Sequence, residues 1–479
     1  MSRHTKIVAT LGPASSDPIV LETLIRAGVD VVRLNFSHGK AEDHIALAAS
    51  VRRVAALVGR PVGILADLQG PKIRIGKFAE GKITLEAGDK FILDAECEQG
   101  SRDRVGLDYK DLPKDVSSGN VLLLDDGRIE LEVERVVGRE IHTLVRHGGE
   151  LSNNKGINRQ GGGLSAPALT AKDMDDIKTA AQIGADFLAV SFPKGAPDMY
   201  MARQLMLACG GRALTIAKIE RVEAVAALEE ILDASDGLMV ARGDLAVEVG
   251  DAAVPALQKR MIRMARSKNK LAITATQMME SMILSPTPTR AEVSDVANAV
   301  LDGTDAVMLS AETAAGHYPV QTVESMARIC LESEKSILIT LDRDFLDRVF
   351  TRIDQSIAMA ALFAAYHLNV KAIAALTSSG STALWMSRLN CGIPIFALTQ
   401  EPATQSKMTL FREVFPLLMK EMHNDPDVLR YDVEQRLIEA GVVIKGDLIV
   451  LSYGDQMGLT GGTNTLTIVR IGERAPPRG

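Results

Sequence analysis

The feature that most constrains the fold is an alternation, from about residue 5 to residue 340, of short apolar runs with segments of helical periodicity. This alternation predicts parallel strands joined by crossover helices. The strand-like runs lie at residues 6–11, 31–35, 62–68, 186–192, 213–220, 236–244, 271–277 and 305–310. Eight such units are the number that a closed (β/α)8 barrel, or TIM barrel, requires.

The alternation is interrupted once, between Pro71 and about Ala166. Two-residue alternation replaces helical periodicity there, as in residues 82–93 and 121–137. The Asp-Asp-Gly-Arg segment at 125–128 predicts a hairpin turn, because Asp-Gly tolerates a positive φ. The sequence therefore predicts an inserted antiparallel β-barrel domain. It follows the third strand, at the end of the barrel where loops carry function, and we expect it to act as a lid.

A third region begins after about Phe345, where strands and helices alternate again. Its strand-like runs lie at residues 371–377, 393–399, 447–454 and 463–471, and helices are expected from Ser381 and near Ala403. This pattern predicts a small C-terminal α/β domain. The predicted domains are the barrel (1–70 and 167–342), the lid domain (71–166) and the C-terminal domain (343–479).

Composition excludes several classes of protein. The chain has 479 residues and a net charge of −7 without a long basic run, which argues against nucleic acid as a partner. Its four cysteines are widely spaced, so neither a disulfide framework nor a zinc site is indicated. No run of about 20 apolar residues indicates a membrane span. We therefore expect a cytoplasmic protein.

Polar residues gather where the predicted strands end, which is where a barrel of this type carries its active site. These residues are Arg33, Asn35, Ser37, His38, Asp67, Ser191, Lys218, Glu220, Arg242, Asp244, Thr276, Gln277, Ser310 and Glu312.

Two of these carboxylates, Glu220 and Asp244, follow neighbouring strands and can share one Mg²⁺ or Mn²⁺ ion. Arg33, Arg74 and Lys218 can neutralise phosphoryl oxygens, because phosphoryl transfer is catalysed mainly by positioning and by opposite charge. A lysine on a barrel strand is also common as an ion-paired structural residue. Lys218 and Glu220 are two residues apart and so face the same side, which favours the catalytic interpretation.

Other candidates have a structural alternative. His38 can contact a nucleotide phosphate, or belong with Asn35 and Ser37 to a helix cap. Arg290 can begin a helix capped near Thr289, or reach a neighbouring subunit. We expect the other histidines to be superficial or structural, and Met278, Met279 and Met282 to fill the core.

Seven segments together resemble the signatures of the pyruvate kinase family, in the family's order. They are RLNFSHG (33–39), DLQGPKIR (67–74), LSNNKGIN (151–158), IAKIE (216–220), MVARGDLAVE (239–248), ATQMMESM (275–282) and AVMLSAETAAG (306–316). The resemblance covers essentially the whole chain. It implies a glycolytic enzyme, a homotetramer, that transfers a phosphoryl group from phosphoenolpyruvate to ADP and yields pyruvate and ATP.

The resemblance also implies residue roles. Lys218 would stabilise the transferring phosphoryl group, and Glu220 and Asp244 would bind magnesium. Substrate would contact Arg33, Lys218, Ala241, Arg242, Gly243, Asp244 and Thr276, with Thr276 also on the proton path to the enolate. The nucleotide phosphates would contact Asn35, Ser37, His38, Arg74 and Lys172.

One departure concerns potassium. Members of this family that need potassium resemble one another in having Thr after the equivalent of Asp67 and Glu at the position of Lys72, whereas this chain has Leu68 and Lys72. A fixed ammonium can take the space and charge of a monovalent ion. We therefore hypothesise that Asn35, Ser37 and Asp67 persist as a monovalent site, but that Lys72 makes potassium dispensable.

The C-terminal domain of this family commonly carries an allosteric site for a sugar phosphate or nucleotide. The candidate turn here is Thr377, Ser378, Ser379, Gly380, Ser381 and Thr382, which offers hydroxyls and backbone amides before a helix. A plain helix cap is the alternative. Family members with Arg after this glycine have a phosphate contact that Ser381 cannot supply. We expect the loop at 454–464 to close over the turn.

Two alternative functions are compatible with part of the predicted fold and site. One is a magnesium-dependent lyase or mutase acting on phosphoenolpyruvate or a related 2-oxo acid. The other is an inactive sugar-phosphate sensor that uses only the C-terminal domain. The lid and the cationic residues argue against the first, and the presence of every expected site residue argues against the second.

Overall fold

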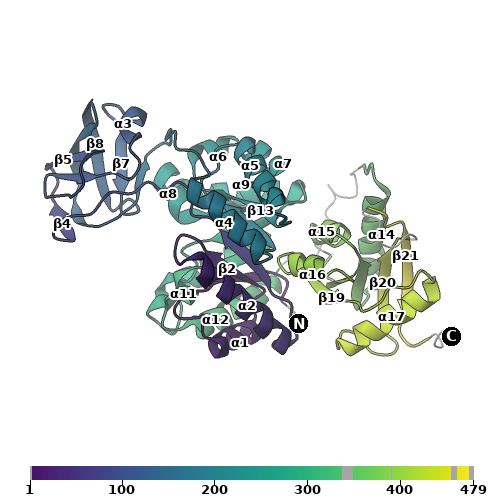
Figure 1. Ribbon diagram of the computed structural model, residues 1–479. Coiled ribbons are helices and arrows are strands. Elements are labelled where there is room, and N and C mark those ends of the chain that lie inside the picture. Colours follow the sequence, from purple (N-terminus) through teal and green to yellow (C-terminus); the bar gives the residue numbers. More distant parts are fainter. Residues whose placement is uncertain (1–2, 337–348, 390, 455–460, 474–479) are drawn as a thin grey trace.

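The computed structural model describes residues 3–336, 349–389, 391–454 and 461–473. Figure 1 shows a central barrel, a β-rich lid domain on one side and an α/β domain on the other. The lid strands fall within residues 82–159, between the third barrel strand and the helix that begins at Ala171. The predicted boundary at 342/343 lies outside the described residues.

The central barrel is closed and parallel, as predicted. Its strands, in the order in which they pair, are β1 (Lys6–Thr10), β16 (Ala306–Leu309), β15 (Leu271–Ala275), β14 (Gly237–Ala241), β13 (Leu214–Ile219), β12 (Phe187–Val190), β3 (Gly63–Asp67) and β2 (Val31–Asn35), which pairs again with β1. Every predicted strand is present. The carboxyl ends of all eight therefore open on one end of the barrel, which we term the mouth.

Helices cover the outside of this barrel. They are α1 (Pro18–Ala27), α2 (Ala41–Val58), α4 (Ala171–Gln182), α5 (Ala196–Ala208), α6 (Val222–Ala226), α7 (Leu228–Ala234), α8 (Arg242–Val249), α9 (Val254–Ser267), α10 (Arg290–Leu301), α11 (Ala311–Ala314) and α12 (Pro319–Glu334). The core between strands and helices includes Met278, Met279 and Met282, all fully buried as predicted. Thr289 caps α10 by accepting a hydrogen bond from the amide of Glu292, which confirms the predicted helix start.

The lid domain is built almost entirely of strands. They are β4 (Lys82–Leu85), β5 (Lys90–Asp94), β6 (Arg104–Gly106), β7 (Val121–Leu124), β8 (Ile129–Val137), β9 (Glu140–His147), β10 (Gly149–Ser152) and β11 (Ile157–Arg159), with one short helix, α3 (Leu112–Asp115). Six form one sheet, and β4 pairs with β10. The pairing is antiparallel except between β5 and β6. The predicted hairpin joins β7 to β8, with positive φ at Asp125, Asp126 and Gly127.

The C-terminal domain is a five-stranded sheet with helices against it. Its elements are α14 (Ile353–Leu368), β17 (Ala372–Leu376), α15 (Ser381–Ser387), β18 (Ile395–Thr399), α16 (Pro402–Met408), β19 (Val414–Leu418), α17 (Pro426–Glu439), β20 (Leu448–Tyr453) and β21 (Thr465–Arg470). Sequence patterning missed β19, which contains Pro416. This strand lies at the sheet edge, where a proline is tolerated.

The C-terminal domain packs against the end of the barrel opposite the mouth. Arg388, which follows α15, forms an ion pair with Asp305, at the residue before β16 begins. Lys6, the first residue of β1, donates a hydrogen bond from Nζ to the carbonyl of Val414 at 2.6 Å. The mouth is therefore left to the lid domain.

None of the described helices is long and apolar enough to cross a membrane. All four cysteines are free thiols in this structure.

Candidate active site

A buried ionic cluster surrounds Lys218 at the mouth. Its Nζ lies 2.6 Å from Ser191 Oγ, 2.9 Å from Glu220 Oε1 and 3.3 Å from Asp67 Oδ1. These residues come from β13 and from the ends of β3 and β12, which the barrel places side by side. Sequence alone placed Lys218 beside Glu220, but only the closed barrel adds Asp67 and Ser191.

The cluster keeps Lys218 charged. Burial by itself lowers the pKa of Lys218, but the carboxylates of Asp67 and Glu220 outweigh it, and the pKa lies above its ordinary value. For the carboxyl group of Asp67, burial has the opposite effect and raises the pKa. The positive charges of Lys218 and Arg33 outweigh burial and bring this pKa below its usual range. One ammonium and one carboxylate are thus held ionised in a site that excludes most water.

Arg33 joins this cluster from β2. Its Nε donates to Asp67 Oδ2 at 2.6 Å, and its Nη1 donates to Thr10 Oγ1 at 3.1 Å. The other oxygen of Asp67 is buried without a hydrogen-bond donor and makes only the ion contact with Lys218. The predicted cations Arg33 and Lys218 therefore meet at one carboxylate.

The two predicted magnesium ligands lie on consecutive barrel units. Glu220 follows β13, and Asp244 lies in the first turn of α8, which follows β14 directly. Burial, and next the negative charge of Asp244, raise the pKa of Glu220 even though Lys218 acts against them. A divalent cation between these carboxylates would relieve their repulsion, so the donor set fits magnesium.

Lys72 contacts Asp244 rather than the predicted monovalent site. Its Nζ lies 3.0 Å from Asp244 Oδ1 and 3.8 Å from Asp126 Oδ1, on the lid hairpin. Burial lowers the pKa of Lys72, but these two carboxylates raise it above its ordinary value. In this structure its ion pairs therefore do not include Asp67, whose partners are Arg33 and Lys218.

Thr276 follows β15 in an uncommon backbone conformation, with a φ of +66°. Its Oγ1 accepts a hydrogen bond from the amide of Gly243 at 2.8 Å and donates one to the carbonyl of Ala275 at 2.6 Å. The hydroxyl is thereby fixed beside Gly243, which was predicted to contact the substrate.

The side chain of Arg242 is enclosed by contacts within the protein. It is buried, and its guanidinium donates to the carbonyls of Ala275, Thr276 and Gln277 and pairs with Asp295. Its neighbours Gly243 and Asp244 line the pocket, but Arg242 does not. Only the backbone of Arg242 is left to contact a substrate, because its side chain is bonded to the turn after β15 and to Asp295.

The nucleotide candidates after β2 form a turn. Asn35 Oδ1 accepts a hydrogen bond from the amide of Ser37 at 3.1 Å, while the His38 side chain is exposed. Lys172 donates from Nζ to the carbonyl of Phe36 at 2.6 Å, which places it beside this turn. The helix α2 begins later, at Ala41, with Lys40 at the N-cap position. The helix-capping alternative for Asn35, Ser37 and His38 is therefore wrong.

Arg74 lies apart from this group, in the lid domain. Its Nη1 donates to the carbonyl of Asn154 at 3.0 Å, and its amide donates to Asp108 at 2.8 Å. Both contacts are within the lid domain.

A pocket of about 490 Å³ lies between the mouth and the lid. It is lined by Lys72, Leu123, Asp126, Gly127, Gln160, Gly243, Asp244, Ala246, Val247, Gly250, Asp251, Thr276, Gln277, Glu280, Ile283, Ser310, Ala311 and Glu312. Sequence reasoning missed Asp126, Gln160 and Glu280. Asp126 and Gln160 belong to the lid domain, where the rule that active-site residues follow the carboxyl ends of barrel strands does not apply.

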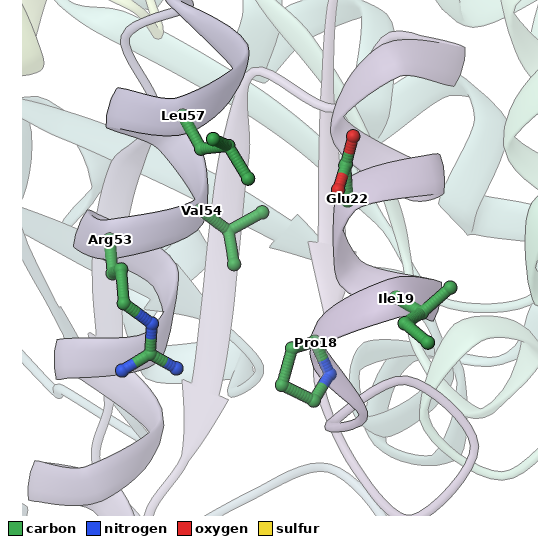
Figure 2. A pocket seen from close by; sticks show the side chains of 6 residues that line it. All are labelled: Pro18, Ile19, Glu22, Arg53, Val54 and Leu57. Atoms are coloured by element: carbon green, nitrogen blue, oxygen red, sulfur yellow. The ribbon is translucent and has the colours of Figure 1, made fainter.

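A second hollow, of about 480 Å³, lies between α1 and α2 and is shown in Figure 2. Its lining is largely apolar, with Glu22 and Arg53 as its charged residues. Ile19 and Leu57 are mostly exposed there. It contains none of the predicted site residues, so it does not compete with the mouth as an active site.

The candidate effector turn lies between β17 and α15. Gly380 has a φ of +85° and donates its amide to Thr377 Oγ1 at 2.8 Å, and Thr382 Oγ1 lies 2.9 Å from Thr463 Oγ1. Gly380 is the N-cap residue of α15, without a side chain to cap it. Residues 455–460 of the expected covering loop lie outside the described residues.

Comparison with known proteins decides the family. A family model described as "Pyruvate kinase, barrel domain" matches residues 2–323, and a second, described as "Pyruvate kinase, alpha/beta domain", matches residues 355–469. The chain belongs to the pyruvate kinase family. The predictions of a pyruvate kinase and of a phosphotransferase enzyme are confirmed, and the lyase, mutase and sensor alternatives are set aside.

Individual pyruvate kinases are similar over nearly their full lengths. Pyruvate kinase II of Salmonella typhimurium is 53% identical, covering 98% of this chain and 99% of its own. The pyruvate kinase of Haemophilus influenzae is also 53% identical, over 95% of this chain and 96% of its own. That of Mycobacterium intracellulare is 43% identical, over 99% of each. The similarity therefore includes all three domains.

Proposed function

We propose that this pyruvate kinase transfers the phosphoryl group of phosphoenolpyruvate to ADP at the mouth of the barrel, where the Lys218 cluster adjoins the pocket that Asp244 and Thr276 line. The observation that carries the proposal is the Lys218 cluster: a buried, charged ammonium held by Asp67 and Glu220 beside Asp244. Phosphoryl transfer needs fixed positive charge and orientation more than it needs a protein nucleophile.

Glu220 and Asp244 would hold magnesium or manganese. No group of three or more His, Cys, Asp or Glu side chains in the described part of the chain could bind a metal by itself. Magnesium is commonly held by one or two carboxylates, with substrate oxygens and water completing its shell. When bound, the ion would neutralise phosphoryl charge. The pair of carboxylates suits a metal that arrives with its substrate.

In the first step, an oxygen of the β-phosphate of ADP forms a bond to phosphorus while the bond from phosphorus to the enol oxygen breaks. Lys218 and Arg33 face the negative charge that is redistributed in this transfer. The leaving group is the enolate of pyruvate. In the second step a proton adds to its methylene carbon, and the hydroxyl of Thr276, which touches the pocket, lies on the path for that proton.

The nucleotide phosphates would lie along the turn of Asn35, Ser37 and His38, with Lys172 behind it. Arg74 would reach them when the lid domain moves towards the mouth. The ion pair of Lys72 with Asp244 and with Asp126 on the lid hairpin supports a lid that responds to the charge in the pocket.

Potassium would not be required. Lys72 brings a fixed ammonium to within 3.0 Å of Asp244, where its charge reaches the same pocket as the phosphates. Asn35, Ser37 and Asp67 would remain as the residues of the monovalent site. Because Lys72 pairs with Asp244 rather than Asp67, the ammonium would act on the pocket as a whole rather than occupy the potassium position.

We further propose regulation and assembly as in the family: a sugar phosphate or nucleotide at Thr377–Thr382, a homotetramer, and a cytoplasmic location. The positive φ of Gly380 and the several hydroxyl groups of this turn suit a phosphate. Sedimentation of the purified chain, with and without sugar phosphates, tests both assembly and effector binding.

The deciding experiment is coupled pyruvate production from phosphoenolpyruvate and ADP with magnesium. Activity in the wild type and its loss in Lys218→Met would support the assigned chemistry. Absence of wild-type activity, even with sugar phosphates present, would overturn the proposal. Full activity in Lys218→Met would retain the reaction but remove Lys218 from it.

A further inference from the structure

The turn that follows β15 is held in a conformation that its residues do not favour. Thr276 and Gln277 have φ values of +66° and +52°. A positive φ is uncommon outside glycine, and for a β-branched residue such as threonine it is an outlier. Such conformations are energetically unfavourable and persist only where the surroundings impose them. Something must therefore hold Thr276 in place.

The guanidinium of Arg242 contacts every carbonyl of this turn. Nη2 donates to the carbonyl of Thr276 at 2.6 Å and to that of Gln277 at 3.2 Å, and Nε donates to the carbonyls of Ala275 and Thr276 at 3.2 Å. Nη2 also lies 2.8 Å from the sulfur of Met278. A planar fork that meets three successive carbonyls fixes their directions, and so fixes the two positive φ values between them.

Asp295 fixes Arg242 from the other side. This residue of α10 accepts from Arg242 Nη1 at 2.7 Å, and Gln258 of α9 lies 3.5 Å from the same nitrogen. Arg242 is buried, with 8% of the residue exposed, and its charge is paired with Asp295 rather than open to substrate. Two barrel helices thus anchor the side chain that anchors the turn.

The conformation of this turn affects the pocket through the hydroxyl of Thr276. With the turn in place, Thr276 Oγ1 accepts the amide of Gly243 at 2.8 Å and lines the pocket together with Asp244. If Thr276 relaxed to a negative φ, its side chain would leave this position, because φ sets the direction of Cβ. The position of the hydroxyl therefore depends on Arg242.

We propose that Arg242, fixed by Asp295, is a positioning residue for the protonation step: it holds Thr276 in the left-handed conformation that presents its hydroxyl to the enolate. The proposal rests on the proposed proton path, in which a hydroxyl hydrogen passes to the methylene carbon of the enolate and is replaced from water. Arg242 itself touches neither substrate nor metal.

The test compares the two steps of the reaction. Proton transfer is measured as the exchange of the methyl protons of pyruvate in D₂O with magnesium and ATP, followed by proton NMR. Phosphoryl transfer is measured as ATP formed in a single turnover from phosphoenolpyruvate and ADP. In Arg242→Met we expect exchange to fall by about 10- to 100-fold, as for a catalytic group displaced by about 1 Å, and ATP formation to fall much less.

Four further variants separate positioning from general damage. Thr276→Ala and the double variant Thr276→Ala/Arg242→Met are expected to exchange equally slowly, because removing the hydroxyl leaves Arg242 nothing to position. Arg242→Lys is expected not to restore exchange, since an ammonium cannot meet three carbonyls. Arg203→Met is the matched control: Arg203 pairs with Asp236 at 3.0 Å near the opposite end of the barrel.

Two outcomes would overturn the proposal: exchange within twofold of wild type in Arg242→Met, or losses in the single variants that multiply in the double variant. If Arg242→Met does not fold, Asp295→Asn decides, since it keeps the shape of Asp295 and removes its charge. A several-fold loss of exchange in Asp295→Asn supports the proposal, and an exchange rate equal to that of the wild type contradicts it. Failure of the proposed function is distinct, because the wild type would then form no ATP.

Discussion

At the scale of single residues, Lys218 is the side chain on which most of the proposed chemistry depends. We expect Lys218→Met to lower kcat by roughly 10²–10³-fold or more, because a fixed charge at the transferring group is lost. The variant should also be less stable, by about 3–5 kcal/mol, since buried Asp67 and Glu220 lose their shared cation. Steady-state kinetics and denaturant unfolding measure the two effects.

A matched control is Lys178→Met, which removes an exposed lysine paired with Asp175 on the surface of α4. It should change neither kcat nor stability measurably. A Lys218→Met enzyme with kcat near that of the wild type would show that the cluster is structural only.

Lys72 tests the role of potassium. The wild type is expected to keep its activity when potassium chloride is replaced by tetramethylammonium chloride. In Lys72→Glu we expect activity to depend on potassium, because the fixed ammonium beside Asp244 is replaced by a carboxylate. Assays in both salts, with exposed Lys77→Glu as the control, measure this. Collapse of the wild type in tetramethylammonium would contradict the prediction.

At the scale of elements, the segment from β3 to the lid domain passes too close to the cluster for any side chain at Gly70. Gly70 has a φ of +66°, and an added Cβ would lie 2.7 Å from Cβ of Ser191, whose hydroxyl accepts from Lys218. We expect Gly70→Ala to displace Ser191 and Lys218 and to lower kcat by up to about 100-fold. Steady-state kinetics measure it.

Gly81→Ala is the control for backbone strain. Gly81 also has a positive φ, +81°, but an added Cβ would meet nothing within 4 Å. This variant should lose about 1 kcal/mol of stability and no activity. Equal kinetic effects of the two substitutions would show that strain, rather than contact with Ser191, matters at Gly70.

The helix α8 carries a pH-dependent group. Burial raises the pKa of Glu248 from an ordinary 4.5 to about 7, while a hydrogen bond from the amide of Val222 acts against it. The folded protein therefore binds more protons than the unfolded chain between these values. The stabilisation by Glu248 is complete below pH 4.5 and is lost as the pH rises through about 7.

We expect Glu248→Gln, which keeps an acceptor oxygen but cannot ionise, to gain stability relative to the wild type as the pH rises from about 5 to about 8. The gain is at most about 3 kcal/mol, from 1.36 kcal/mol for each pKa unit. Urea unfolding of both proteins at the two pH values measures it. A difference in unfolding free energy that does not change with pH would contradict the raised pKa.

At the scale of the whole molecule, the barrel and the C-terminal domain are joined through Asp305. This fully buried carboxylate pairs with Arg388 and accepts the amide of Arg412 at 3.1 Å. We expect Arg388→Met to lower the free energy of unfolding by about 3–5 kcal/mol, because a buried charge loses its partner. Denaturant unfolding measures this.

The control is Lys82→Met, which breaks an exposed pair with Glu150 in the lid domain. Its cost should stay below about 1 kcal/mol. Similar losses in the two variants would mean that the contact between barrel and C-terminal domain adds little to stability.

The amino-acid sequence was enough to predict the strands of the barrel, the inserted domain, the hairpin at 125–128 and the residues at the strand ends. It could do so because side-chain periodicity and turn chemistry are local properties of the chain. In a parallel barrel, the carboxyl ends of the strands necessarily meet at one end, so Lys218, Glu220 and Asp244 could be placed together before any coordinates were known.

The directions of the longer side chains, and the groups that they contact, could not be predicted without the packed fold. Arg242 lies in the same short motif as Asp244, yet it turns back onto Thr276 and Asp295. Lys72 pairs with Asp244 rather than with Asp67. These partners come from distant segments, and a long cationic side chain takes whichever nearby oxygens compensate its desolvation. That choice is set by packing, which the local pattern of residues does not report.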